Sequence, residues 1–325
     1  MSSENSRPFG RRLSSSDASL NQALGGGNVT RPTASSSSKA AATRTAGEEA
    51  FQARPARYHL DDIILPASAR RSIERLIASV RNYEQLSQWA PTVFDSKRKY
   101  LAVNFYGPPG TGKTMCAEAL ASEFRQPLLE VNYAELESEL WGKSSKNIQL
   151  AFRRAHEQSA VLFFDEADSV LASRIKTPGH SSDQHVNLSR SVLLKQLDSF
   201  AGIVFFATNL AKNYDRAFVR RIYQHIEVPL PDLEGRMLIW KRMLTPSIPG
   251  YHSLDWCALS QASDGLSGGD IANVIRQALP DLRDNDADTK ELSLEILIHC
   301  IEDVRRSRRD VGEPGGPSYS HMETQ

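Results

Sequence analysis

The sequence has few cysteines, no long apolar run and no excess of charge of either sign. It holds three cysteines among 325 residues, and no two of them form a CxxC pair, so a disulfide framework is not expected. Read as buried thiols, Cys116, Cys257 and Cys300 favour a reducing compartment. No apolar run approaches the roughly 18 residues that span a bilayer, and no apolar segment near the N-terminus is typical of a signal peptide. These absences predict a soluble protein of the cytoplasm without a membrane partner.

The charge is balanced, with 39 basic and 39 acidic residues and a formal net charge of zero at pH 7. A protein that binds nucleic acid or an acidic lipid surface usually carries an overall basic footprint, which is missing here. The composition therefore disfavours those two classes.

Residues 1–57 are rich in serine and glycine, with runs at 14–16, 25–27 and 35–38, and they show almost no periodic apolar pattern. Such a segment buries too little apolar surface to offset the entropy cost of ordering, so we expect a disordered tail. The alternative is an organellar transit peptide, which suits the serines and arginines. Glu4 and the glycine run disfavour the amphipathic helix that such a peptide needs. The tail could bind an adaptor protein.

From residue 58 onward, short apolar runs alternate with longer stretches of helical periodicity. Strands are expected at 101–106, 128–132, 160–164, 202–207 and 225–228. The expected helices include 67–86, 112–124 and 146–157. This alternation implies right-handed crossovers and a parallel sheet covered by helices on both faces, and so predicts an α/β domain at 58–230.

Beyond Pro231 the periodicity is helical only. Helices are expected at 233–243, 253–262, 269–279 and 292–307. Helices without strands over such a length predict a small, separate helical domain at 231–307. The glycines and prolines that follow predict a second unstructured tail at 308–325.

Residues 107–114 match the phosphate-loop pattern G-x-x-x-x-G-K-[ST], which a chain of this length meets by chance in roughly one case in a hundred. The loop falls between an expected strand and an expected helix. Its glycines let backbone N–H groups converge on phosphate oxygens, while Lys113 reaches the β- and γ-phosphates and Thr114 ligates Mg²⁺. The alternative is a glycine-rich turn with an incidental lysine. The residues expected to bind the nucleotide here are Pro109, Gly110, Thr111, Gly112, Lys113, Thr114 and Met115.

Residues 161–166 form an apolar strand that ends in two acids. At the carboxyl end of a parallel strand, Asp165 would hold Mg²⁺ and Glu166 would act as general base toward the attacking water. A solvated strand end is the alternative when the pattern is taken alone. A GTPase would carry an Asn-Lys-x-Asp guanine reader, which is missing, and a small-molecule kinase usually lacks the second acid. The pair favours ATP hydrolysis.

Together these motifs resemble the AAA family of ATPases, and the resemblance runs from about Leu60 to Val304. It implies the P-loop NTPase (AAA+) fold, a parallel five-stranded sheet sandwiched by helices and followed by an all-helical lid. Asn209, at the end of the fourth strand, resembles the sensor-1 residue that orients the lytic water. Arg220 and Arg221 resemble arginine fingers that reach a neighbouring subunit's nucleotide. Without the family, Asn209 is an ordinary turn residue and the arginines lie on a solvated helix end.

The resemblance also implies an adenine site. Gly268 and Gly269 lie in a segment similar to sensor 2, which contacts the base, and Asp62 and Ile63 align with the segment that reads it from the other side. Two apolar residues, Ile64-Leu65, replace the glycines that usually follow there. Ile239 and Met243 would complete the base pocket, although apolar residues four apart on a helix are otherwise ordinary core.

Family members usually form hexameric rings that pull polypeptide through a central pore. The corresponding pore loop here is Leu140, Trp141 and Gly142, with the aromatic residue one position later than in the family pattern. Trp141 would grip substrate side chains or, alternatively, anchor the loop within its own subunit. The loop 173–187 occupies the place of a second pore loop.

Two further classes stay open from the sequence. A nucleic-acid-remodelling or loader-type ATPase shares the nucleotide site, but only the cluster 305–309 is strongly basic, and no helix-turn-helix or zinc module follows the lid. A slow, nucleotide-gated scaffold is the other class. A zinc protease is disfavoured because His156-Glu157 lacks a second histidine. We expect a protein-remodelling ATPase that uses ATP and Mg²⁺, assembles as a homohexamer and acts on polypeptide.

Overall fold

Five parallel strands form the central sheet of the described residues, in the order β2-β3-β4-β1-β5. This computed structural model describes residues 51–92, 100–132, 144–172, 181–209, 214–282 and 290–310. The strands lie close to the expected ranges, and the apolar runs of β1, β3 and β4 are buried. Their bounds are β1 Tyr100–Tyr106, β2 Leu128–Asn132, β3 Val161–Asp165, β4 Gly202–Thr208 and β5 Gln224–Glu227.

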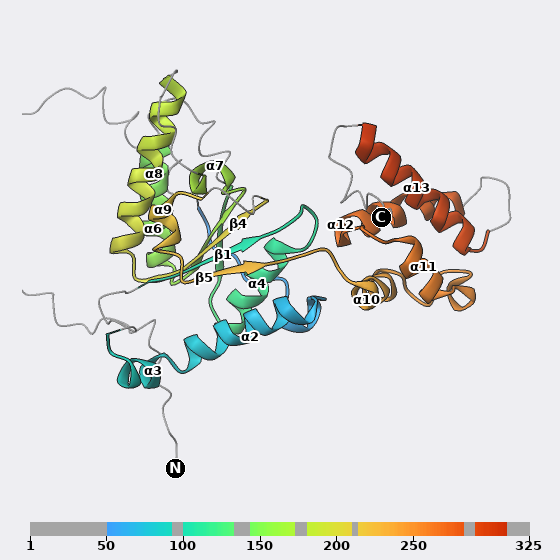
Figure 1. Cartoon of the computed structure of the whole chain (residues 1–325), viewed down its shortest axis with the longest axis horizontal. Helices are drawn as coiled ribbons and strands as arrows, with labels where there is room; N and C mark the ends of the chain where they lie inside the picture. Colours follow the sequence, from blue (N-terminus) through green and yellow to red (C-terminus); the bar gives the residue numbers. More distant parts are fainter. Residues whose placement is uncertain are drawn as a thin grey trace, which may run out of the picture.

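Helices cover both faces of this sheet (Figure 1). One face packs on α2 (Ala67–Arg81) and α4 (Lys113–Glu123). The other packs on α6 (Ser144–Glu157), α8 (Ser181–Ser199) and the short helices α7 (Asp168–Leu171) and α9 (Arg216–Val219). The predicted α/β fold with a helix-covered parallel sheet is confirmed.

The strand order decides where the chemistry lies. Because β4 lies between β3 and β1, the residues that follow these three strands meet at one edge of the sheet. Three motifs that are far apart in the sequence, the phosphate loop, the acidic pair and Asn209, therefore become neighbours.

The expected single helix over 67–86 is wrong in its extent. The chain leaves the helix at Asn82, whose backbone N–H and side-chain amide both bond to the Ala78 carbonyl, and α3 (Tyr83–Trp89) follows as a separate helix. A short polar side chain that competes for backbone groups in this way often ends a helix.

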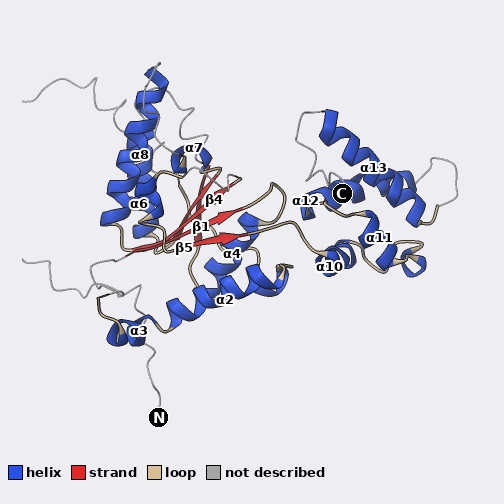
Figure 2. Ribbon diagram, viewed as in Figure 1, coloured by secondary structure: helices blue, strands red, loops and turns tan. Residues whose placement is uncertain are grey.

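The helical part is made of α10 (Leu233–Met243), α11 (Trp256–Ala262), α12 (Gly268–Ala278) and α13 (Leu294–Asp310), with no strand among its described residues (Figure 2). Its core surrounds the fully buried Trp240, whose indole N–H donates to Ser263 Oγ over 3.0 Å. Short 3₁₀ turns lie at Leu60–Asp62, Tyr251–Ser253 and Pro280–Leu282. Each of the four helices expected beyond Pro231 overlaps one of these helices.

Two expected boundaries need correction. Helix α13 continues to Asp310, beyond the expected end at 307, because Arg305 and Arg308 bond to α11, the turn after it and α12. At the other end, residues 51–57 are ordered and do not belong to a disordered tail. Arg54 exchanges two 2.8 Å backbone hydrogen bonds with Leu128 of the edge strand β2.

The structure tests two further expectations, the burial of the three cysteines and the absence of a membrane-spanning helix. Cys116 and Cys300 are buried as expected, but Cys257 is exposed. Among the helices that the structure describes, none combines the length and apolar character needed to cross a membrane.

Candidate nucleotide-binding site

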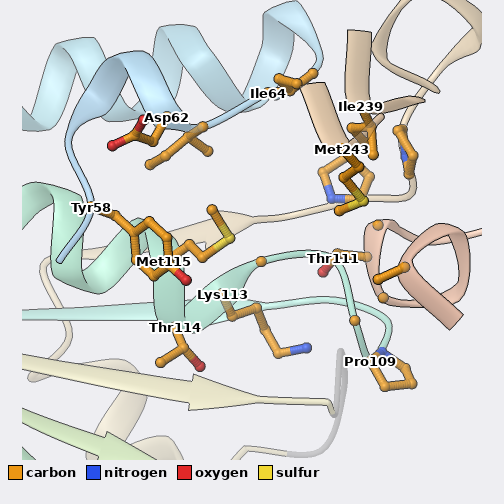
Figure 3. Close-up of a pocket in the computed structure, with 18 of the residues that line it drawn as sticks. Tyr58, Asp62, Ile64, Pro109, Thr111, Lys113, Thr114, Met115, Ile239 and Met243 are labelled. Atoms are coloured by element: carbon orange, nitrogen blue, oxygen red, sulfur yellow. The ribbon is translucent and has the colours of Figure 1, made fainter. Parts of the chain in front are cut away.

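A cavity of about 660 Å³ lies between the α/β part and the helical part (Figure 3). Every residue that the sequence predicts to bind the nucleotide lines it, together with Glu166 and Asn209. Met243, which was also expected in the base pocket, lines the cavity too. The other lining residues are Tyr58, Ile64, Pro229, Pro231, Arg242, Ala272 and Arg276. Met243 and Ile64 belong to the segments expected near the base.

The phosphate loop has a backbone that only glycine can adopt at two positions. Gly107 has φ 146°, and a Cβ there would lie 2.3 Å from the Val228 carbonyl oxygen. Gly110 has φ 72°, and a Cβ there would lie 2.5 Å from Ser267 Oγ. The loop therefore packs between Val228, which follows β5, and Ser267 in the helical part. It ends at Lys113, where α4 begins. The first residues of this helix line the cavity, and the free N–H groups of a helix N-terminus stabilise an anion.

Lys113 places its ammonium group at the centre of this loop. Its Nζ donates to the carbonyl oxygens of Gly107 (2.9 Å) and Pro108 (2.8 Å) and to Asn209 Oδ1 (2.8 Å). Burial lowers the pKa of Lys113, while the nearby carboxylates of Asp165 and Asp168 act to raise it. The lysine thus joins the end of β1 to the end of β4.

Thr114 and Asp165 form a pair of oxygen donors beside the lysine. Thr114 Oγ1 donates to Asp165 Oδ2 over 3.0 Å, from the start of α4 to the end of β3. A hydroxyl and a carboxylate side by side suit Mg²⁺, which prefers oxygen ligands and takes few of them from protein when phosphates supply the rest. The residues present therefore fit the expected ion.

Glu166 has an unusual backbone conformation at the cavity wall. Its φ is 51°, in the left-handed region, and its N–H donates to Asp165 Oδ1 over 2.9 Å. A non-glycine residue in this region is strained, and such strain concentrates at functional sites. The exposed Glu166 side chain lines the cavity, where a water could reach it.

Asn209 is held by a residue that the sequence analysis missed. Asp168, the first residue of α7, accepts a 2.9 Å hydrogen bond from the Asn209 N–H and a second bond from the Thr208 hydroxyl. Asp168 lies three positions after Asp165, so the run Asp165-Glu166-Ala167-Asp168 carried the signal. Asp168 therefore fixes the position of Thr208 and Asn209 at the end of β4.

The helical part closes the cavity through backbone and charge contacts. The Gly269 N–H donates to the Gly110 carbonyl over 3.0 Å. Arg242 of α10 bonds to the Asp61 carbonyl (2.7 Å) and the Asp62 carboxylate (2.5 Å). For two of the lining residues that were not predicted, helical spacing could have indicated that they lie at the cavity. Arg242 and Ala272 each lie three positions after a predicted residue, Ile239 and Gly269, and so share its helix face.

Arg220 and Arg221 are not among the lining residues of this cavity. Arg221 binds Asp198 of α8 through two bonds of 2.8 and 2.7 Å, and it also donates to the Ala217 carbonyl. Arg220 is exposed just after α9, whose N-terminus is capped by Asp215. The expected pore residues Leu140, Trp141 and Gly142 lie outside the described residues, as do residues 173–180 of the second expected pore loop.

Comparison with known proteins agrees with this geometry. The sequence model of the "ATPase family associated with various cellular activities (AAA)" matches residues 103–230, which hold the phosphate loop, the acidic pair and Asn209. The chain belongs to the AAA family of ATPases. The matched residues thus begin within β1 and end just after β5.

Several proteins are similar to this AAA protein over most of its length. Katanin p60 ATPase-containing subunit A1 of Strongylocentrotus purpuratus is 33% identical over 233 residues, 68% of this chain and 43% of that protein. The A-like 1 subunit of Danio rerio is 31% identical over 71% of this chain and 48% of its own length. Protein CdcH of Halobacterium salinarum is 33% identical over 64% of this chain and 28% of its own. The chain spans less than half the length of these relatives.

Solved structures agree on the fold. The crystal structure of the FIGL-1 AAA domain superposes with a TM-score of 0.63 at 22% identity, covering 82% of this chain and 92% of that one. The same domain in complex with ADP gives a TM-score of 0.64 at 21% identity, covering 83% and 94%. The matched length includes the helical part as well as the AAA sheet.

Proposed function

We propose that the chain hydrolyses ATP in a ring-shaped homo-oligomer and uses this reaction to remodel polypeptide substrates. One observation supports this most directly. Lys113, the Asp165-Glu166 pair and Asn209 meet in one cavity between the two parts of the chain. That is the set of groups a phosphoryl transfer to water requires.

The roles of the site residues follow from their positions. The phosphate-loop N–H groups and the Lys113 ammonium would hold the β- and γ-phosphates and stabilise the charge that develops on them. Glu166 would accept a proton from the attacking water, and Asn209 would orient that water through its side-chain amide. Asp62, Ile63, Ile239, Gly268 and Gly269 line the part of the cavity expected to hold the base.

Thr114 and Asp165 would hold Mg²⁺ with the nucleotide. When bound, this ion would neutralise part of the negative charge of the nucleotide's phosphates. Asp165 also accepts a hydrogen bond from the Glu166 N–H, so the same carboxylate links the metal ligands to the proposed base.

The oligomer is supported by where the arginines lie. Because Arg220 and Arg221 are not lining residues of the chain's own cavity, a role in catalysis requires them to act on a neighbouring subunit's nucleotide. This proposal also includes a hexameric ring and a pore loop at 140–142. It further includes an adaptor bound by the N-terminal segment and a cytoplasmic location. The balanced charge, with no overall basic footprint, favours protein over nucleic acid as the substrate class.

The test separates nucleotide binding from turnover. Glu166→Gln keeps the size of the side chain but removes the base, so we expect normal ATP binding with hydrolysis reduced at least about 100-fold. Glu74→Gln, an exposed glutamate on α2 that does not line the cavity, is the matched control and should hydrolyse at the wild-type rate. Turnover by Glu166→Gln at the wild-type rate would contradict the assignment.

A further inference from the structure

Three polar side chains from distant parts of the sequence meet on one face of the sheet. Asn104 is a fully buried residue of β1, where it is in register with Phe206 of β4 on one side and His225 of β5 on the other. Tyr214 lies against both Asn104 and His225. These three residues, which we name the Asn104 cluster, were not among the expected site residues.

The contacts within the Asn104 cluster are direct. Asn104 Nδ2 lies 3.2 Å from the Tyr214 hydroxyl oxygen and 3.3 Å from His225 Nδ1. The Tyr214 and His225 rings stack, with centroids 5.5 Å apart and planes at 29°. Because an amide nitrogen only donates, His225 Nδ1 must accept, which requires a neutral ring. Burial lowers the pKa of His225, in agreement with this.

The cluster continues without a break to the nucleotide site. The Tyr214 hydroxyl hydrogen-bonds with the Thr208 side chain, and the Thr208 hydroxyl donates to Asp168. Asp168 accepts from the Asn209 N–H, and the Asn209 side chain accepts from Lys113 Nζ. A chain of hydrogen bonds therefore runs from β5 to the phosphate-binding lysine.

The other side of the cluster holds the arginine-bearing segment. Tyr214 and His225 flank residues 215–224, which include Arg220 and Arg221, and both flanking side chains contact Asn104. The start of this segment is also fixed to the end of α7, because the Asp215 N–H donates to the Leu171 carbonyl over 2.8 Å. The segment is thus tied to β1 at its two ends by one amide.

The cluster is unfavourable for the fold alone. Asn104 lies in a face of the sheet otherwise lined by Ala102, Phe164 and Phe206. Within the described part of the chain, Asn104 Oδ1 and His225 Nε2 are buried without a hydrogen-bond partner. An apolar residue at 104 would avoid this desolvation cost, so stability does not account for the asparagine.

We propose that Asn104, Tyr214 and His225 are positioning residues, which hold Asn209 and the arginine-bearing segment in one fixed arrangement. They act through Thr208 and Asp168 and touch no nucleotide. The inference rests on the proposed ATPase function and adds to it a specific physical link between the site of one subunit and the arginines that would serve its neighbour.

The test measures ATP hydrolysis by the full chain after a substitution that removes a single hydroxyl group. Tyr214→Phe keeps the ring stack on His225 but removes the hydroxyl that joins Asn104 to Thr208. Well below the melting temperature, we expect kcat for ATP to fall about 10-fold while KM and the Kd of a fluorescent ATP analogue change less than about two-fold. Tyr223→Phe removes a hydroxyl from an exposed tyrosine of the same segment and should leave kcat unchanged.

A double-mutant cycle with Asn209→Ala distinguishes positioning from general destabilisation. Because the cluster acts in part through Asn209, Tyr214→Phe should lower kcat by a smaller factor in the Asn209→Ala background than in the wild type. Asn104→Leu, which removes the amide at similar size, should repeat the kcat loss of Tyr214→Phe. Additive losses, a wild-type kcat in both variants, or an equal loss of nucleotide affinity and kcat would each overturn the proposal. An inactive wild-type protein would instead contradict the proposed function.

Discussion

Lys113 and Asn209, which are 96 positions apart in the chain, are joined by a 2.8 Å hydrogen bond at the floor of the cavity. The bond connects the phosphate loop after β1 to the residue that ends β4. The two motifs were expected separately from the sequence, and the strand order brings them together. The lysine therefore helps to fix the position of Asn209.

This relationship gives the first prediction. Lys113→Ala removes the buried ammonium from the loop and leaves Asn209 without its donor, so binding of a fluorescent ATP analogue should weaken at least about 100-fold. Lys195→Ala, an exposed lysine on α8, is the control and should bind like the wild type. An unchanged Kd for Lys113→Ala would remove the phosphate-loop assignment.

A second prediction concerns the shape of the phosphate loop. Gly107→Ala places a Cβ 2.3 Å from the Val228 carbonyl oxygen, so the backbone must shift, and both the melting temperature and ATP affinity should fall. Gly265 also has a positive φ, 75°, but a Cβ there would meet nothing within 4 Å, which makes Gly265→Ala the matched control. The control should lose only about 1 kcal/mol from its strained backbone and keep its ATP affinity. Equal losses of affinity in the two variants would contradict the packing argument.

The two arginines after α9 should behave differently. Arg220→Ala should spare nucleotide binding but lower hydrolysis about 10³-fold in the assembled form, as expected for a residue that acts on a neighbour. Arg221 already binds Asp198 within its own subunit, so Asp198→Asn separates its structural contact from its catalytic role. That variant keeps Arg221, so it should retain hydrolysis and melt within a few degrees of the wild type, because exposed ion pairs contribute little. Loss of nucleotide binding by Arg220→Ala would show that it acts in its own subunit.

A fourth prediction concerns pH and the segment before the sheet. Burial raises the pKa of Glu118, but hydrogen bonds from Arg54 (2.7 Å) and the Arg57 N–H (2.9 Å) outweigh this and lower it to about 2. Because the folded-state pKa is depressed, Glu118 stabilises the fold above its unfolded pKa of 4.5 and loses that contribution as the pH falls toward 2. The contribution at neutral pH is roughly 3 kcal/mol.

Urea unfolding of Glu118→Gln against the wild type measures this contribution. The difference in free energy of unfolding should be largest at pH 7 and narrow steadily between pH 5 and pH 3. Glu74→Gln, which makes the same change at an exposed glutamate of α2, is the matched control. A difference that stays constant with pH would show that the loss comes from packing alone.

The sequence predicted β1, β3 and β4 well because each of these strands is a short, largely apolar run that the sheet buries on both faces. It predicted the phosphate loop and the acidic pair because their chemistry is local. It missed Asp168, Arg242 and Tyr58, whose positions depend on which strands and helices become neighbours. The break at Asn82 was missed because both flanking segments have helical periodicity.

The Asn104 cluster shows most clearly which features cannot be predicted from local sequence patterns. Asn104, Tyr214 and His225 belong to two strands and a loop, and each reads as an ordinary residue in its own segment. Only the pairing of β1 with both β4 and β5 places them together. The pairing is set by the packing of the whole domain.

The most direct test of the account is the specific ATPase activity of the full chain over a wide range of protein concentration, with sedimentation at each concentration. We expect the activity per chain to rise as the oligomer forms, and we expect Arg220→Ala to abolish this rise without preventing assembly. A monomer that hydrolyses ATP at a constant, appreciable rate across the whole range would contradict it.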